Sequence, residues 1–292
     1  MAADGLVVID KPAGCTSHDV VARCRRAFRS KRVGHAGTLD PAVTGVLVVA
    51  VGRVTRLVRY LGLHAKAYVG EIALGVSTST LDAAGEETGR VDMSAVTLDQ
   101  VRGAATGLTG TIRQVPPMVS AVRVGGKRLH ELARAGIEVE RAARPVTVHR
   151  FEILEAVEPG IFRVEVDCSS GTYVRSLAAD LGEALGGLAH LKSLRRTAVG
   201  PFVESEAVDL REVEERGLEV LLSAADAVRG MAAVTLSDGQ AADVRQGKRL
   251  AAEQVGAAES AGPWAAFTEA GDLVAVCRND DGRFQPEVVL AG

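Results

Sequence analysis

One carboxylate stands out in this sequence because of the loop around it. Asp40 lies within the segment 33–45, VGHAGTLDPAVTG, which holds three glycines and a proline directly after the aspartate. Glycine adopts backbone angles closed to other residues, while Pro41 fixes its own φ and disfavours helical angles at Asp40. We therefore expect a stiff, shaped loop. An aspartate in such a loop can act as a nucleophile or a general base, or it can simply cap a turn.

The elements on either side of this loop are expected to hold it in place. The apolar run 45–51, GVLVVAV, predicts a buried strand that would support a site rigidly. Upstream, the segment 5–10 predicts another strand, and Thr16 with Asp19 predicts a capping box that starts a helix. The far face of that helix and its end carry a cluster of cations: Arg23, Arg25, Arg26, Arg29, Lys31 and Arg32.

Two tyrosines and an arginine lie at the ends of predicted strands. Tyr68 lies in a strand predicted over 66–74, where a tyrosine is most often half-buried in the core. A strand predicted over 161–168 shows strict alternation and leads into a helix whose first turn contains Tyr173 and Arg175. Taken alone, Arg175 could be an ordinary surface arginine.

Size and composition are those of a globular protein that stays out of membranes. The chain has 292 residues, of which 47% are hydrophobic and 24% charged. No apolar run approaches the roughly 18 residues of a membrane helix, and the start of the chain lacks a secretory-signal pattern. The four cysteines are widely spaced, which argues against a zinc site and fits reduced thiols in a cytosol.

The net charge of −3 hides a strong gradient along the chain. Residues 1–60 hold ten Lys and Arg against four Asp and Glu, whereas residues 201–292 hold eight against seventeen. Binding to phosphates depends on local fields, so a basic face is expected near the N-terminal loop. A second basic helix is predicted over 53–61, with Arg53, Arg56 and Arg59 directed outward.

The last part of the chain changes character from about Val228. Short apolar segments alternate with glycine-containing turns, a pattern typical of a small, mainly β unit. The segments predicted as strands are 234–236, 255–256, 264–267 and 273–276. Turns are predicted at 238–239 and 270–272.

Several motifs together resemble those of the TruB family of tRNA pseudouridine synthases. The loop reads G-H-x-G-x-L-D-P-x-x-x-G around Asp40. It is accompanied by D-K-P-x-G-x-T-S around Lys11, by K-x-Y ending at Tyr68, and by G-T-Y-V-R ending at Arg175. The stretch H-L-x-x-L-R-R-x-x-x-G-x-F contains Leu194. These motifs span nearly the whole chain, so the resemblance is specific.

The resemblance implies roles for individual residues. Asp40 would be the catalytic carboxylate and Arg175 its ion-pair partner, opposing the rise in pKa that burial causes. Three residues would contact the substrate or line its pocket. Tyr68 would stack on the target base, Tyr173 would lie beside the base, and Leu194 would pack against the pocket. An aromatic platform of this kind contributes about 1–3 kcal/mol per base.

Other residues keep more than one interpretation. Lys11 is included among the residues around the substrate, where it would brace the catalytic loop. His35 would fill the space left by a flipped base or, equally, brace the loop. Ser79 departs from the family, which usually has an acid there. Arg195 and Arg196 are either solvated or directed at phosphates.

The resemblance also implies a fold. We expect an α/β protein of the α+β type, with a pseudouridine synthase catalytic domain over residues 1–227. Its central sheet would be mixed, largely antiparallel and flanked by helices. Residues 228–292 would form a small, mainly β PUA-like RNA-binding domain. The acidic charge of that domain leaves open a second interpretation, in which it is a stabilising cap.

The implied function is isomerisation of the T-loop uridine at position 55 of tRNA to pseudouridine after base flipping. The resemblance implies no cofactor and no metal, a monomer, a cytoplasmic location and tRNA, through its T-stem-loop, as the partner. The alternative is a non-catalytic RNA-binding or tRNA-folding protein that uses the same basic face without needing Asp40. A glycosidase-like hydrolase is disfavoured because it would use a pair of carboxylates.

Overall fold

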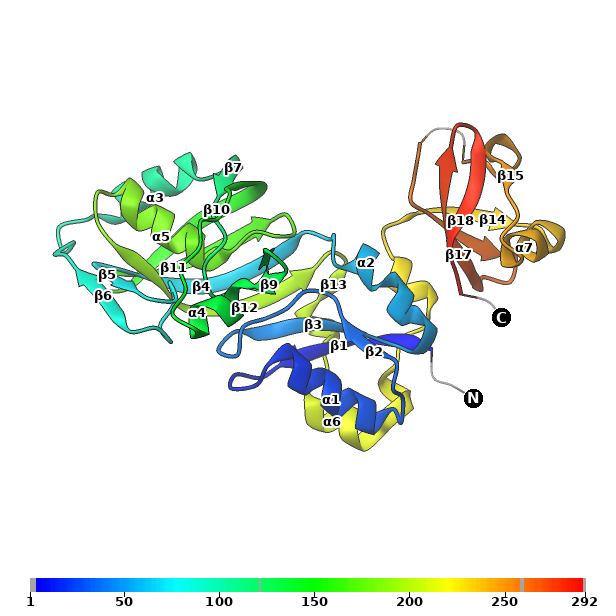
Figure 1. Ribbon diagram of the computed structural model, residues 1–292, viewed down its shortest axis with the longest axis horizontal. Helices are drawn as coiled ribbons and strands as arrows, with labels where there is room; N and C mark the ends of the chain where they lie inside the picture. Colours follow the sequence, from blue (N-terminus) through cyan, green and yellow to red (C-terminus); the bar gives the residue numbers. More distant parts are fainter. Residues whose placement is uncertain (1–3, 121, 258–259, 291–292) are drawn as a thin grey trace.

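The protein is built from two bodies, each with its own sheet (Figure 1). The computed structural model describes residues 4–120, 122–257 and 260–290. The larger body contains a nine-stranded sheet and the smaller one, drawn in orange and red, a five-stranded sheet. A mixed α/β architecture with a central sheet and a further C-terminal sheet confirms the predicted fold class.

The large sheet brings distant parts of the chain into contact. In spatial order its strands are β1 (Gly5–Lys11), β3 (Thr44–Val51), β12 (Ala189–Val199), β4 (Lys66–Leu74), β11 (Ile161–Cys168), β10 (Arg144–Glu158) and β7 (Gly110–Gln114). The short strands β2 (Val33–His35) and β13 (Phe202–Val203) pair with β3 and β12. The β3–β12 pair is parallel, and the other pairings in this sheet between described residues are antiparallel. The predominantly antiparallel mixed sheet is therefore as predicted.

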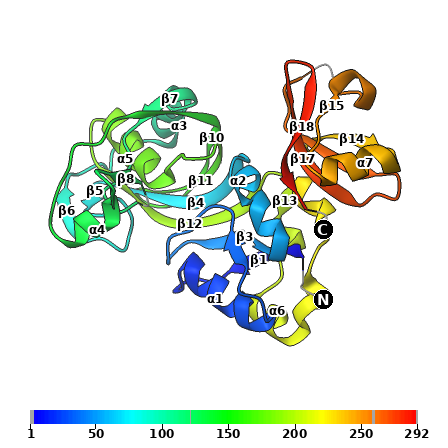
Figure 2. The same ribbon diagram turned by 45° about the vertical axis from the view of Figure 1, so that its right-hand side comes forward.

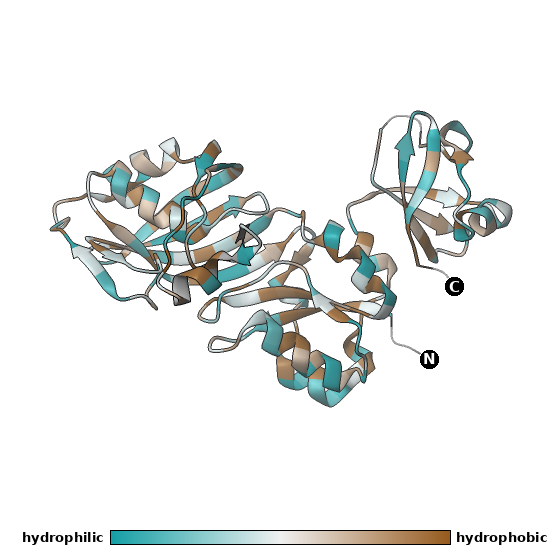
Figure 3. Ribbon diagram, viewed as in Figure 1, coloured by the Kyte–Doolittle hydropathy of each residue, from teal (hydrophilic) through white to brown (hydrophobic). Residues whose placement is uncertain are grey.

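Helices cover one face of this sheet. Near β1 and β3 the cover is α1 (Ser17–Ala27) with α6 (Leu210–Arg216), and near β10 and β11 it is α3 (Leu98–Gly107) with α5 (Val174–Ala184) (Figures 1 and 2). The apolar stripes of these helices and the alternate strand residues form one core cluster. Figure 3 shows hydrophobic residues interleaved with hydrophilic ones along these elements, as expected where each buries one face.

The other face of β1 and β3 is buried as well. It packs against η1 (Gly52–Leu57) and α2 (Val58–Leu61), and residues of the smaller body join the same apolar cluster. The prediction of one helix over 53–61 is wrong in its first half, where a 3₁₀-helix forms. The outward-facing arginines are also engaged: Arg53 pairs with Asp4, Arg56 donates to a carbonyl of the smaller body, and Arg59 pairs with a glutamate there.

The smaller body differs from its prediction at two places. Its strands, in spatial order, are β14 (Ala232–Leu236), β16 (Trp264–Thr268), β17 (Leu273–Asp280), β18 (Arg283–Val289) and β15 (Leu250–Ala251). The strand predicted at 255–256 is instead the end of η5 (Ala252–Val255) and its following turn. The turn predicted at Asp238 is the start of α7 (Asp238–Arg245), because Ser237 and Gln240 form a capping box.

Short elements complete the chain. They are β5 (Val76–Thr78), β6 (Glu87–Arg90), β8 (Arg123–Val124), β9 (Lys127–Arg128), α4 (Leu129–Arg134), η2 (Glu204–Glu206), η3 (Gly217–Val220) and η4 (Ala225–Val228). In the described part of the chain, no helix is both long and apolar enough to cross a membrane.

Candidate active site

The loop that carries Asp40 is anchored from behind. Pro41 offers its carbonyl to the Lys11 ammonium at 3.2 Å, and Leu39 exchanges two hydrogen bonds of 2.9 and 3.2 Å with the Ser17 hydroxyl. Ser17 is the first residue of α1, and Lys11 is the last residue of β1. The aspartate therefore sits on a loop fixed by two neighbouring elements, which is the rigid support that a reactive group requires.

Arg175 meets Asp40 and holds it in a network. One guanidinium nitrogen lies 3.1 Å from a carboxylate oxygen of Asp40, and the other lies 3.4 Å from Asp82. The same side chain donates to the carbonyl oxygens of Thr80 at 3.1 Å and Val119 at 2.7 Å. The side chain of Arg175 is 6% exposed, whereas that of Asp40 is 40% exposed. The side chain of Arg175 is thus held in one place, and Asp40 is the member of the pair that solvent or a ligand can reach.

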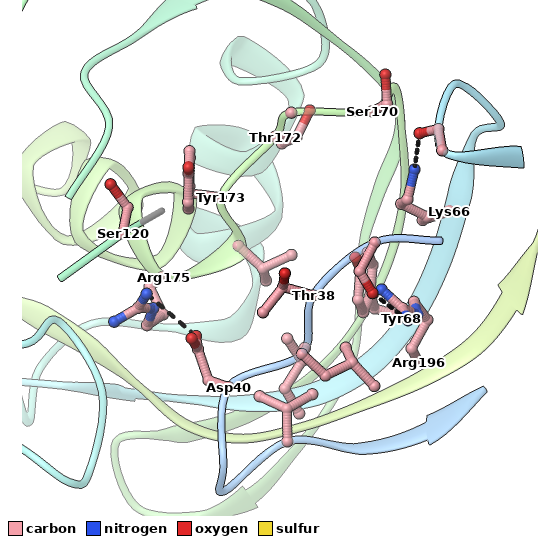
Figure 4. Close-up of a pocket in the computed structure, with 17 residues that line it drawn as sticks. Thr38, Asp40, Lys66, Tyr68, Ser120, Ser170, Thr172, Tyr173, Arg175 and Arg196 are labelled. Carbon is pink, nitrogen blue, oxygen red and sulfur yellow. Dashed lines mark hydrogen bonds and ion pairs between the residues drawn. The ribbon is translucent and has the colours of Figure 1, made fainter. Parts of the chain in front are cut away.

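A cavity of about 280 Å³ opens in front of this pair. Of the seven residues predicted for the site, five line it: Asp40, Tyr68, Tyr173, Arg175 and Leu194. Figure 4 shows the Asp40–Arg175 contact on one side of the cavity and Tyr68 on another. The volume is near the lower end for ligand pockets, which suits one small flat group such as a single pyrimidine with its sugar.

The charge state of Asp40 follows from competing effects. Burial raises the pKa of Asp40 above its ordinary value, and the Arg175 guanidinium opposes this rise. The Asp82 carboxylate raises the pKa of Asp40 further, whereas the Lys11 ammonium lowers it. The net rise leaves an aspartate that is more basic than one in water, and therefore a better proton acceptor and nucleophile once ionised.

Tyr68 forms an aromatic wall of the cavity. It lies on β4 opposite Arg196 of β12, and only 8% of the residue is exposed. Burial raises the pKa of Tyr68, while a hydrogen bond with Arg196 acts in the opposite sense. The phenol is therefore neutral and held in one orientation, with part of its surface available to the cavity.

Tyr173 and Arg175 are placed by a clamp on the start of α5. Tyr173 is the N-cap of this helix and makes no capping hydrogen bond through its own side chain. The side-chain amide of Gln114 pairs with the Tyr173 backbone instead, accepting from its N–H at 2.7 Å and donating to its carbonyl at 3.0 Å. The end of β7 thereby fixes where the helix begins and where Arg175 projects.

Lys11 and His35 lie outside the lining of the cavity. Lys11 is fully buried, and its ammonium donates to three backbone carbonyls, so its placement supports a bracing role and no contact with a substrate. His35 packs edge-to-face on His18 with ring centroids 5.9 Å apart. Its Nδ1 is buried without a hydrogen-bond partner among the described residues, and burial lowers its pKa.

Several residues of the site received no role from the sequence. Asp82 shares Arg175 with Asp40, while Lys66 and Arg196 line the cavity as further cations. Period-two alternation along β12 would have placed Arg196 on the same face as Leu194, because residues two apart share a face of a strand. Of the two interpretations offered for Arg195 and Arg196, solvation does not hold for Arg196, which is buried, while Arg195 pairs with Asp10 and Glu204.

Solved structures share this fold. A chain of a Cbf5–Nop10–Gar1 complex matches with a TM-score of 0.77 and 28% identity, covering 98% of this chain and 85% of that chain. A chain of an H/ACA RNP bound to a substrate RNA containing 2′-deoxyuridine matches with a TM-score of 0.75 and 27% identity, covering 99% and 85%. Residues 25–174 match the family model of the TruB family pseudouridylate synthase N-terminal domain. The fold and the matched domain are those of a pseudouridine synthase.

The remaining comparisons specify which branch of that class this is. Residues 175–225 match the tRNA pseudouridylate synthase B C-terminal domain, and residues 231–291 match the tRNA pseudouridine synthase II C-terminal model. The tRNA pseudouridine synthase B of Thermobifida fusca (strain YX) is 47% identical, with 99% of both chains covered. That of Arthrobacter sp. (strain FB24) is 46% identical, covering 98% and 96%. The chain belongs to the TruB family.

Proposed function

We propose that this protein converts the T-loop uridine at position 55 of tRNA into pseudouridine, with Asp40 as the catalytic carboxylate. The relatives that it matches along their whole length are named tRNA pseudouridine synthase B. One observation carries the assignment to Asp40: an accessible carboxylate lies 3.1 Å from the buried Arg175, at the mouth of a cavity walled by Tyr68.

The reaction needs a carboxylate and a closed pocket. The N1–C1′ bond of uridine breaks, the uracil turns within the pocket, and C5 joins C1′ while the C5 proton leaves and N1 gains one. Asp40 can attack C1′, add to C6 or remove a proton from C2′. Each route requires the ionised form, and the positive charge of Arg175 stabilises that form.

A uridine in a folded RNA reaches this cavity only after leaving its stack. Flipping costs a few kcal/mol, and stacking on the ring of Tyr68 offsets part of that cost. Tyr173 and Leu194 would then confine the base from its other sides. A T-loop, whose bases are already partly splayed, suits this mode of entry. The same proposal places the protein in the cytosol, where tRNA is processed and where its free cysteines stay reduced.

The test uses a T-stem-loop RNA with tritium at C5 of the target uridine. Wild type should release tritium and form pseudouridine, whereas Asp40→Asn should lose about 10³-fold or more in turnover while still binding the RNA. Asp99→Asn is the matched control, because the Asp99 side chain is 94% exposed and lies far along the sequence in α3. Equal product from wild type and Asp40→Asn would overturn the role of Asp40.

The same assay distinguishes this function from its alternative, a protein that only binds or folds RNA. A non-catalytic RNA-binding or tRNA-folding protein would bind the stem-loop and form no pseudouridine at all. Position 55 is tested separately, by moving the labelled uridine to another position of the T-loop. Equal product at both positions would overturn the assigned position while leaving the reaction intact.

A further inference from the structure

Two cations, Lys66 and Arg196, are buried side by side in the cavity, and no acid among the described residues pairs with either. Lys66 is 8% exposed and Arg196 1% exposed, and both line the cavity. A methyl group placed on Gly37 would lie 3.4 Å from Cε of Lys66 and 3.5 Å from a guanidinium nitrogen of Arg196, so the two side chains flank the same glycine. Neither forms an ion pair with any carboxylate of residues 4–120, 122–257 or 260–290.

Their hydrogen bonds go to neutral groups. The Lys66 ammonium donates to the carbonyls of Gly62 at 2.9 Å and His64 at 2.7 Å. Arg196 donates to the carbonyls of Val46 at 2.7 Å and Gly37 at 3.1 Å. Buried charges are ordinarily paired, and like charges brought together in a poorly solvated place repel each other. This end of the cavity therefore carries unbalanced positive charge, which an anion would neutralise.

The position of Lys66 indicates which anion. Figure 4 shows Lys66 and the Asp40–Arg175 pair at opposite ends of the cavity, with Tyr68 and Arg196 on the Lys66 side. Arg175 is already neutralised by Asp40 and Asp82, so the unbalanced charge is confined to the Lys66 end. The hydroxyl-bearing residues Ser170 and Thr172 also line this cavity. Charged donors and hydroxyls around one space are the groups that bind phosphate.

We propose that the Lys66 end of the cavity is a phosphate subsite, which takes a phosphodiester group adjoining the flipped uridine. This inference rests on the proposed function, because it assumes that a nucleotide of an RNA chain occupies the cavity. Lys66 would contact the phosphate, while Arg196 would raise the local positive potential from behind Tyr68. The subsite would fix the sugar–phosphate backbone and so set the sugar of that nucleotide against Asp40.

The subsite has a predictable pH dependence. Burial lowers the pKa of Lys66 to about 8, Arg196 lowers it as well, and Cys168 acts in the opposite direction. The groups that face the ammonium are Arg196 from β12, Cys168 from β11 and the neighbouring His64. Only the protonated form binds an anion, so affinity for RNA should fall as pH rises through about 8.

Binding is measured in the Asp40→Asn background, which removes turnover. Lys66→Gln should bind the T-stem-loop about tenfold more weakly, and its plot of log affinity against log salt should be shallower by about 0.7, the value for one lost phosphate contact on a single strand. Lys66→Arg should retain most of the affinity and abolish the loss above pH 8. Lys192→Gln, which removes a cation paired with Glu71 outside this cavity, is the matched control.

Modified RNA separates a phosphate contact from a structural effect. A neutral methylphosphonate linkage is placed on the 5′ or the 3′ side of the target uridine, one at a time. One of them should weaken binding to the Lys66-intact protein about tenfold and leave binding to Lys66→Gln unchanged. Thermal unfolding of each variant controls for folding, and Lys66→Arg must restore binding.

The subsite is overturned if Lys66→Gln, folded as judged by its melting curve, keeps the same affinity and salt dependence. It is also overturned if each neutral linkage weakens RNA binding equally in the Lys66-intact protein and in Lys66→Gln. Pseudouridine formation by the unaltered protein is measured in parallel. Product from wild type with no binding defect in Lys66→Gln rejects the subsite alone, whereas no product from wild type rejects the proposed function.

Discussion

Arg175 has more partners than a single ion pair requires. Its guanidinium contacts the carboxylates of Asp40 and Asp82 and the carbonyls of Thr80 and Val119, which belong to three segments of the chain. An arginine presents five N–H donors in a rigid plane, whereas a lysine presents three around one atom. The guanidinium therefore both orients the Asp40 carboxylate and ties the 80–82 turn to the segment around 119.

This predicts that Arg175→Lys fails although it keeps the charge. Two or more acceptors would lose their donor in a buried place, which costs about 1–3 kcal/mol for each. The free energy of unfolding, measured by urea denaturation, should fall by about 2 kcal/mol or more for two such acceptors. Turnover should fall by at least tenfold. Arg113→Lys, on β7 and with one carbonyl contact at the surface, is the control. A fully active Arg175→Lys would contradict the assigned network.

The pH profile tests the balance of charges at Asp40. The reaction needs the carboxylate, so kcat/KM should fall as pH drops through the pKa of Asp40, which lies above the ordinary aspartate value. Arg175 lowers that pKa, so Arg175→Gln should move the acid limb of the profile to higher pH. Residual turnover of this variant between pH 4 and 8 is the measurement. If the acid limb of the pH profile stays at the same pH in Arg175→Gln, a group other than Asp40 controls it.

Among the elements, the parallel contact between β3 and β12 decides the shape of the site. Gly45 is paired with Arg196 across this contact and has a φ of +97°. A Cβ at this position would lie 2.1 Å from the backbone oxygen of Arg196. Both the turn of the Asp40 loop into β3 and the close approach of the two strands therefore require glycine.

Gly45→Ala should accordingly destabilise the protein by about 3 kcal/mol or more, since the left-handed conformation and the overpacking each contribute about 1–3 kcal/mol. The control is Gly103→Ala in α3, where a Cβ meets nothing within 4 Å. Because alanine favours helix, that variant should be more stable by about 0.5–1 kcal/mol. Urea denaturation measures both. Equal stabilities of Gly45→Ala and wild type would show that the strands can separate without loss.

At the scale of the whole molecule, the two bodies are joined by specific contacts as well as by apolar packing. Glu287 of β18 accepts a hydrogen bond of 2.7 Å from the Tyr60 hydroxyl and pairs with Arg59 at 3.5 Å. Arg56 donates to the Val289 carbonyl at 2.6 Å. The basic 53–61 segment thus docks the acidic C-terminal body, and much of its charge is used within the protein.

Removing this junction has a measurable consequence. Glu287→Ala should lower the free energy of unfolding by about 1 kcal/mol, the size of a charged hydrogen bond that is only partly shielded from water. Glu269→Ala, an exposed acid of the same body, should change it little. Tritium release from the T-stem-loop would report whether the junction also matters for turnover. Identical stabilities of the two variants would contradict a junction held by Glu287.

Local signals accounted for the predictions that succeeded. The capping box at Thr16 forms as expected, because it involves residues three apart on one turn. The prediction at 255–256 failed because two apolar residues do not distinguish a strand from a 3₁₀ turn. At Asp238 the glycine that follows suggested a turn, yet the capping pair on either side of it started a helix.

By itself the sequence determined the loop around Asp40, the alternation that buries one face of each strand, and the start of α5 at Tyr173. These features depend on backbone preferences and on neighbours a few residues away. Only the tertiary structure decided that Arg175 is shared with Asp82, and that Arg196 is buried beside Lys66. Arg175 and Asp82 are 93 positions apart along the chain. Arg196 and Lys66 are still further apart, and they meet because β12 pairs with β4, an order that no local pattern encodes.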